Sequence, residues 1–164
     1  MKNADTLKVT TPSDREIQIT RLFDAPRQLV FDAYTKPELL KRWLFGPDGW
    51  SLAVCEVDLR VGGKYRYVWR HLKNGKEMGM GGEIRELVVP ERLVSTEKFD
   101  EAWYPGEGAL GTVVLTQQGK RTLVTQTIRY ESKEARDTAL QAGMMDGMKA
   151  GYDRLDTVFA EMQQ

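Results

Sequence analysis

The chain has 164 residues, of which 41% are hydrophobic and 29% charged, so it is long enough to form one domain with a sizeable core. Its 24 basic and 24 acidic residues cancel, which argues against a dedicated nucleic-acid-binding protein, and no apolar run reaches the roughly 20 residues of a membrane span. The single cysteine, Cys55, excludes an internal disulfide and a cysteine-based zinc site, and the single histidine, His71, removes most histidine-ligated metal sites.

The N-terminal segment is polar and lacks the apolar core of a signal peptide. We expect residues 1–13 to form a flexible tail or a frayed strand start, and residues 14–164 to form a single domain. These features predict a cytoplasmic protein, and nothing in the sequence indicates a metal or another cofactor.

The domain is predicted to begin with a strand followed by two short helices. Apolar and polar residues alternate from 15 to 23, which is typical of a half-buried strand. Pro26 then stands where a first helical turn favours proline, and Pro37 opens a second helix in the same way. The apolar face of that second helix ends near Trp43.

The middle of the chain is predicted to form six further strands. The Asn74-Gly75 pair predicts a tight hairpin, because both residues tolerate the positive φ of a type I′ turn. Short turns of this kind join antiparallel strands. The predicted strands cover 51–59, 64–71, 77–89, 92–99, 110–117 and 122–130.

The C-terminal segment has the spacing of a long amphipathic helix. Ser132 is placed to cap its start, and Gly143 marks a kink. The apolar stripe beyond that glycine includes Tyr152, Leu155 and Phe159. A lone amphipathic helix must bury such a stripe, so it is expected to pack against the sheet.

Several short sequence motifs occur in a fixed order between about residue 17 and residue 162. They are Ile19-Thr20-Arg21, Phe23-Asp24-Ala25-Pro26, Val30-Phe31-Asp32-Ala33-Tyr34-Thr35, Pro37-Glu38-Leu39-Leu40-x-Arg42-Trp43, Glu56-Val57-Asp58-Leu59-Arg60-x-Gly62-Gly63, Pro90-Glu91-Arg92-Leu93 and Gly147-Met148-x-x-Gly151-Tyr152-Asp153-Arg154-Leu155. In these motifs the chain resembles the START/Bet v-like (SRPBCC) superfamily. Within it the chain resembles the AHSA-like branch, which is named after the C-terminal domain of the heat-shock-protein-90 ATPase activator. The resemblance implies an α+β helix-grip fold. In that fold a curved seven-stranded antiparallel sheet, with two short helices after its first strand, grips a long C-terminal helix and encloses a cavity.

Aromatic and methionine side chains are the candidates for the wall of this cavity. Tyr65, Tyr67 and Trp69 share one face of a strand, where they either fill the core or line a pocket. Flexible methionines suit an adaptable pocket, and Gly147 and Gly151 withhold side-chain volume from one helix face. We therefore expect a cavity in the lower or middle part of the range of roughly 300–1,000 Å³. The predicted ligand-binding residues are Trp43, Tyr65, Tyr67, Trp69, Met80, Trp103, Met144, Met148 and Tyr152.

The ionisable residues indicate no catalytic constellation. His71 follows a strand and precedes the Asn-Gly turn, which predicts a partly exposed position at the rim. Glu56 and Asp58 share a strand face and are expected to pair with Arg66 or Arg129 on a solvated surface. Glu83, beside a glycine, is the acidic residue for which an inward orientation is the alternative. Cys55 lies between apolar neighbours, which indicates a small packed side chain.

Three functional hypotheses follow. The leading one is the binding of a small hydrophobic or aromatic molecule between the sheet and the C-terminal helix. The first alternative is a polyketide-cyclase-like or hydrolase-like enzyme that uses the same cavity, and an inward ionisable residue with a shifted pKa would favour it. The second alternative is a co-chaperone-like module with a chaperone partner, which an exposed apolar patch outside the cavity would favour.

Overall fold

The computed structural model describes residues 2–100 and 108–164. Within these residues eight strands form one antiparallel sheet in the order β1-β2-β8-β7-β6-β5-β4-β3. The strands are β1 (Lys8–Thr10), β2 (Glu16–Phe23), β3 (Trp50–Val57), β4 (Lys64–His71), β5 (Glu77–Val88), β6 (Arg92–Phe99), β7 (Ala109–Gln118) and β8 (Arg121–Tyr130).

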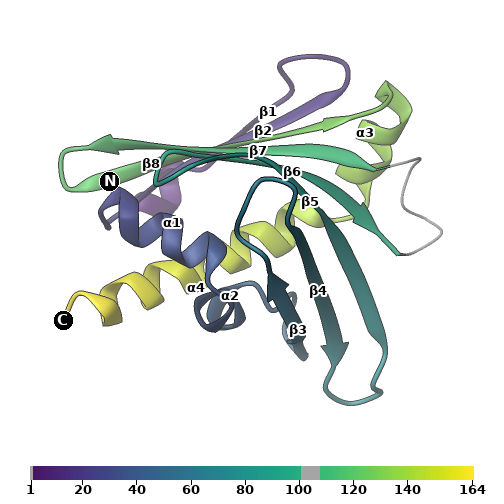
Figure 1. The fold of residues 1–164 in the computed structure, drawn as a ribbon, viewed down its shortest axis with the longest axis horizontal. Helices are drawn as coiled ribbons and strands as arrows, with labels where there is room; N and C mark the ends of the chain where they lie inside the picture. Colours follow the sequence, from purple (N-terminus) through teal and green to yellow (C-terminus); the bar gives the residue numbers. More distant parts are fainter. Residues whose placement is uncertain (1, 101–107) are drawn as a thin grey trace.

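The helices lie on the concave side of this sheet. A short 3-10 helix, η1 (Asn3–Thr6), precedes β1, and the α-helices are α1 (Arg27–Thr35), α2 (Pro37–Trp43), α3 (Lys133–Gln141) and α4 (Met144–Met162). Figure 1 shows the sheet curving so that β3, β4 and β5 bend toward α4, with α1 and α2 beside that helix. Among the described residues no helix is long and apolar enough to cross a membrane.

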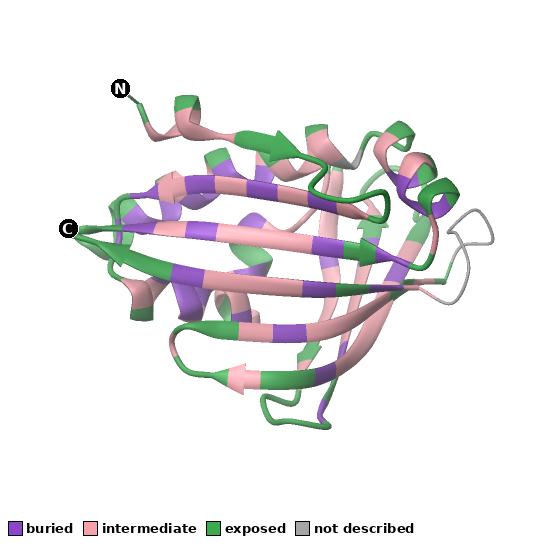
Figure 2. Cartoon of the chain, turned by 90° about the horizontal axis from the view of Figure 1, so that it is seen from above, coloured by how far each residue is buried: buried purple, intermediate pink, exposed green. Residues whose placement is uncertain are grey.

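Alternating side chains divide the sheet into an inner and an outer face. In β2 every second residue, beginning with Ile17 and Ile19, is buried, and β8 continues the pattern through Val124 and Ile128. The same alternation appears as bands along the strands in Figure 2. The inner face packs on the stripe of α4, where Leu155 is fully buried. The predicted α+β class and the amphipathic C-terminal segment are therefore confirmed.

The sheet differs from the predicted seven strands in having one more. Residues 8–10, expected to belong to a flexible tail, form β1 and pair with β2 from Lys8 opposite Thr20 to Thr10 opposite Gln18. The Leu22 amide also donates to the Thr6 hydroxyl at 3.0 Å. Without β1, β2 would present an open edge of unpaired backbone groups, so even a short polar segment gains by pairing there.

The predicted single long C-terminal helix is two helices. Gly143 has φ +79°, a left-handed conformation that ends α3 and directs the chain into α4. The predicted cap at Ser132 is present, because the Ser132 hydroxyl accepts a hydrogen bond from the Ala135 amide at 3.0 Å. The expected kink is thus a complete break, and α4 alone crosses the concave face.

One buried charge fastens α4 to the sheet. Arg21 falls on the inner face of β2 and is 1% exposed. Its guanidinium donates to Asp156 at 2.6 Å and to Asp153 at 3.4 Å, and it lies 4.6 Å from the centre of the Phe23 ring. Both carboxylates belong to α4, so this cation has its partners within the fold.

Candidate functional site

A cavity of about 630 Å³ lies between the concave face of the sheet and α2 and α4. Its walls combine inward-facing residues of β4, β5, β6, β7 and β8 with residues from the last helix. The volume falls within the expected range and is comparable to that of small-molecule sites. Most of the wall is apolar, with a few polar groups set into it.

The structure brings most of the sequence-predicted site residues to this cavity. Those that line it are Trp43, Tyr65, Tyr67, Trp69, Met80, Met148 and Tyr152. Trp103 lies outside the described residues, and Met144 begins α4 but its side chain is also outside the described part of the structure. Contact of any of these side chains with a ligand stays a prediction.

The aromatic wall is a continuous series of ring contacts. Tyr65 and Tyr67 have ring centroids 5.1 Å apart, Tyr67 and Trp69 are 6.0 Å apart, and Trp69 stacks on Phe99 at 6.2 Å. Hydrogen bonds fix two of the rings, because the Tyr65 hydroxyl donates to the Thr96 carbonyl and the Trp69 indole donates to the Leu44 carbonyl at 2.8 Å. A wall held in this way requires little further ordering when a ligand binds.

Two glycines of α4 have different roles. A Cβ at Gly147, which lines the cavity, would meet no atom within 4 Å, so this position leaves space open. A Cβ at Gly151 would lie 3.4 Å from the Trp43 carbonyl oxygen and 3.5 Å from its ring. Gly151 therefore allows close packing of α4 on α2, and Gly147 contributes volume.

Glu97 is a charged side chain of the sheet wall that could not be placed from the sequence. It lies on the inner face of β6 with Leu93, Ser95 and Phe99, all of which line the cavity. Its carboxyl rests over Gly111 of β7, where a Cβ would come 2.4 Å from one carboxyl oxygen. Its remaining accessible surface is therefore toward the cavity, and within the described residues it makes no hydrogen bond or ion pair. Burial raises the pKa of Glu97 from 4.5 to about 7.

Two phenols add polar groups to the interior. Burial, together with the nearby Cys55 and Glu97, raises the pKa of Tyr67 well above its usual range. The Tyr34 hydroxyl is buried without a hydrogen-bond partner in the described residues, although it lies near Tyr152. The Tyr152 hydroxyl itself donates to Gln126 at 3.2 Å, and burial raises the pKa of Tyr152 to about 12.

Charged residues mark the outer edge of the cavity. Asp48 is fully exposed and lies 3.6 Å from Arg154, whose guanidinium stacks 3.7 Å from the centre of the Phe45 ring. Arg154 also donates to the Trp43 carbonyl at 3.5 Å. Asp146, in the first turn of α4, is a second exposed carboxylate of this lining.

His71 lies away from the cavity lining. Its Nδ1 accepts hydrogen bonds from the amides of Lys73 and Asn74 at 3.2 and 3.4 Å, and Trp50 contacts its ring edge-on at 5.2 Å. The histidine therefore stabilises the turn that follows β4. Cys55 is half-buried, and burial raises the pKa of its thiol to about 11, in keeping with the expected packed side chain.

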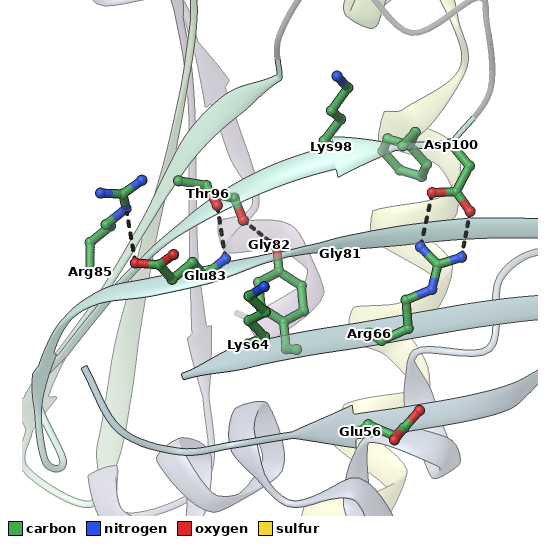
Figure 3. A pocket seen from close by; sticks show the side chains of 12 residues that line it. Glu56, Lys64, Arg66, Gly81, Gly82, Glu83, Arg85, Thr96, Lys98 and Asp100 are labelled. Atoms are coloured by element: carbon green, nitrogen blue, oxygen red, sulfur yellow. Dashed lines mark hydrogen bonds and ion pairs between the residues drawn. The ribbon is translucent and has the colours of Figure 1, made fainter. Parts of the chain in front are cut away.

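The acidic residues considered from the sequence lie mainly on the outer face. An open trough of about 650 Å³ lies there, and Glu83 is 3.9 Å from Arg85. Figure 3 shows these two side chains turned toward each other. Glu56 and Asp58 are exposed, as expected for a solvated surface, but Arg66 pairs with Asp100 and not with either of them. Asp58 pairs instead with Arg60 at 2.9 Å, since the chain turns after β3 and brings that neighbour close. The charges of the trough are thus largely matched by one another.

An antiparallel sheet curved around a C-terminal helix, with a cavity between them, is the arrangement of a helix-grip fold. The family model for activator of Hsp90 ATPase homolog 1-like proteins matches residues 24–160, so the chain belongs to that family. The resemblance to the AHSA-like branch, inferred from the sequence motifs, is therefore confirmed. No curated protein matches the chain.

Solved structures show the same fold. A Rhodobacter sphaeroides protein is 29% identical with a TM-score of 0.89, covering 96% of this chain and 99% of that chain. A Mycobacterium smegmatis protein is 22% identical with a TM-score of 0.82, covering 94% and 98% respectively. An AHSA1-like protein from Aeromonas hydrophila is 20% identical with a TM-score of 0.68, covering 86% and 93%. Each resembles this chain over nearly its full length.

Proposed function

We propose that the protein binds a small hydrophobic or aromatic molecule in the cavity between the sheet and α4. The observation that carries this proposal is the aromatic wall of Tyr65, Tyr67 and Trp69 facing the open space at Gly147. Membership of a family whose fold generally encloses a ligand cavity supports it. A ligand that buries about 200 Å² of apolar surface there gains about 5 kcal/mol.

The binding proposal is tested with Nile red, a neutral dye whose fluorescence reports an apolar environment. We expect saturable binding to the wild-type protein and weaker binding to Gly147→Leu, because the new side chain projects into the cavity. Lys149→Leu is the matched control, since Lys149 lies on the exposed side of the same helix. Both variants are first checked by circular dichroism. Absence of saturable binding to the folded wild type contradicts the proposal.

Acid–base catalysis in the same cavity is a second candidate, and Glu97 is the observation that favours it. A carboxyl with a pKa near 7 can accept or donate a proton at neutral pH. To test this candidate, ligands that bind the cavity are incubated with the wild-type protein or with Glu97→Gln, and mass spectrometry then shows whether they have been converted to a product. A product formed by the wild type alone would place the protein among enzymes.

The chaperone-interaction alternative has weaker support. In the part of the chain that the structure describes, the large exposed apolar side chains include Val61, Leu72 and Val89, which lie in different turns. A partner-binding surface is more often one contiguous patch. A chaperone partner accordingly remains the alternative hypothesis for this family member.

A further inference from the structure

The cavity wall holds a carboxyl group whose partner is not supplied by the surrounding residues that the structure describes. Glu97 has Gly111 beneath it and opens toward the cavity, and no described side chain donates to it. Glu97 is half-buried, and a carboxylate withdrawn from water is normally paired, because an unpaired one loses hydration without compensation. The position of Glu97 therefore indicates that its partner arrives with the ligand.

The charges around the cavity favour a cationic partner. Among the described lining residues, Glu97, Asp48 and Asp146 are acidic and Arg154 is basic. Arg154 is already held by Asp48, Phe45 and a backbone carbonyl. The lining would thus repel an anionic ligand, because its acidic residues outnumber Arg154, which is already paired. The same acidic residues would attract an ammonium group.

The neighbours of Glu97 on the other elements are suited to an ammonium group. Tyr67 on β4 lines the same cavity, close enough for Glu97 to contribute to its raised pKa. Besides the charged residues named above, the other titratable groups of the lining are tyrosines: Tyr65 on β4, Tyr130 on β8, Tyr34 on α1 and Tyr152 on α4. Burial raises the pKa of Tyr67, so this phenol stays neutral at physiological pH. Aromatic ring faces attract cations, and a carboxylate accepts a charge-assisted hydrogen bond from N–H.

We propose that the cavity selects hydrophobic amines, with the apolar body against the aromatic wall and the protonated nitrogen donating to the Glu97 carboxylate beside Tyr67. This inference rests on the proposed ligand-binding function and names the chemical class of its ligand. A neutral alcohol of the same shape fills the cavity equally well but leaves the charge of Glu97 unmatched. A carboxylate of that shape is repelled.

Protonation of Glu97 sets the pH dependence of this selectivity. Below pH 7 the carboxyl is mostly neutral and forms no ion pair, and above pH 7 it is mostly ionised. A simple alkylamine stays protonated across this interval, since its pKa is near that of lysine, about 10.4. If the ionised form alone holds the ammonium, amine affinity rises about tenfold from pH 6 to pH 8. Alcohol affinity does not rise.

The test compares three probes of one shape: phenylbutylamine, phenylbutanol and phenylbutanoate. Their affinities are measured by displacement of Nile red from wild type, Glu97→Gln and Glu83→Gln. We expect wild type at pH 8 to bind the amine at least about tenfold more tightly than the alcohol, and the butanoate least tightly. Glu97→Gln should lose that preference and its pH dependence while it still binds the alcohol.

Glu83→Gln is the matched control, because Glu83 lies in the outer trough and not in the cavity. It should keep the wild-type preference for the amine. If the amine binds no better than the alcohol, or if Glu97→Gln keeps the preference, the amine inference is overturned and the binding function stands. If Nile red and all three probes fail to bind the folded wild type, both proposals are overturned.

Discussion

Removing the charge of Glu97 should stabilise the protein at alkaline pH and leave it unchanged in acid. The carboxyl has a pKa of about 7 in the folded protein, against 4.5 for an ordinary glutamate. Below pH 4.5 it is protonated in both the folded and the unfolded chain, so it makes no difference to stability. Between pH 4.5 and 7 the unfolded chain ionises first, and the folded state loses stability as the pH rises.

The size of the effect follows from the same two values. A pKa that rises from 4.5 to about 7 corresponds to about 3 kcal/mol of unfolding free energy, fully lost above pH 7. Glutamine is isosteric and neutral at every pH. Glu97→Gln should therefore match the wild type near pH 4.5 and exceed it by up to about 3 kcal/mol at pH 8. For a chain of this length that corresponds to a rise in Tm of about 6–12 °C.

Differential scanning fluorimetry and urea unfolding at both pH values provide the measurement. Glu83→Gln is the control, since the Glu83 side chain is 40% exposed and its ion pair with Arg85 is long. Its effect should stay within about 0.5 kcal/mol at either pH. If Glu97→Gln gives the same small change at both pH values, the carboxyl is not buried as described, and the argument from its missing partner is refuted.

Four further variants test the packing of α4 and the limits of the cavity lining. Leu155→Asp should abolish the cooperative thermal transition, because Leu155 is fully buried and an unpaired buried carboxylate costs several kcal/mol; a wild-type melting curve would contradict the packing of α4. Asp156→Asn should lower the free energy of unfolding in urea by about 3 kcal/mol, because it leaves the buried Arg21 guanidinium without its main partner. Arg21→Met should lower it less, because the carboxylates that it leaves unpaired reach water. His71→Gln should leave Nile red affinity within a few-fold, because His71 lies outside the cavity lining, and a loss of a hundredfold in the titration would revive a role for it in the site.

Local patterns predicted much of this fold because they report on single elements. Alternation placed the strand at 64–71 with the same bounds as β4, and the Asn74-Gly75 pair indicated the hairpin that follows it. Alternate residues of a strand point to the same face, so Tyr65, Tyr67 and Trp69 could be assigned to one wall from their odd numbers alone. The extra strand β1 could not be predicted in this way, because its three residues are exposed and its pairing depends on the free edge of β2.

Glu97 was missed because its role depends on a neighbouring strand. The sequence did contain a signal: Glu97 has the parity of Leu93 and Phe99, so an inward β6 face carries a carboxylate. The space for it comes from Gly111 of β7, and that pairing of strands is not encoded in a local pattern. Glu83 attracted attention because a glycine precedes it, yet its parity directs it to the outer face with Lys64 and Arg66.

The buried Arg21 and the half-buried Glu97 show why one charge of the inner face is structural and the other indicates a ligand. Arg21 is 1% exposed and has two carboxylates of α4 within 3.4 Å, so its partners are part of the fold. Glu97 has no such partner among the described residues, and the structure leaves open space in front of it. A buried ion pair can serve packing, but an unpaired carboxylate lowers stability above pH 7 without contributing to it. The compensation for that cost is then expected from a molecule that enters the cavity, and a cation supplies it best.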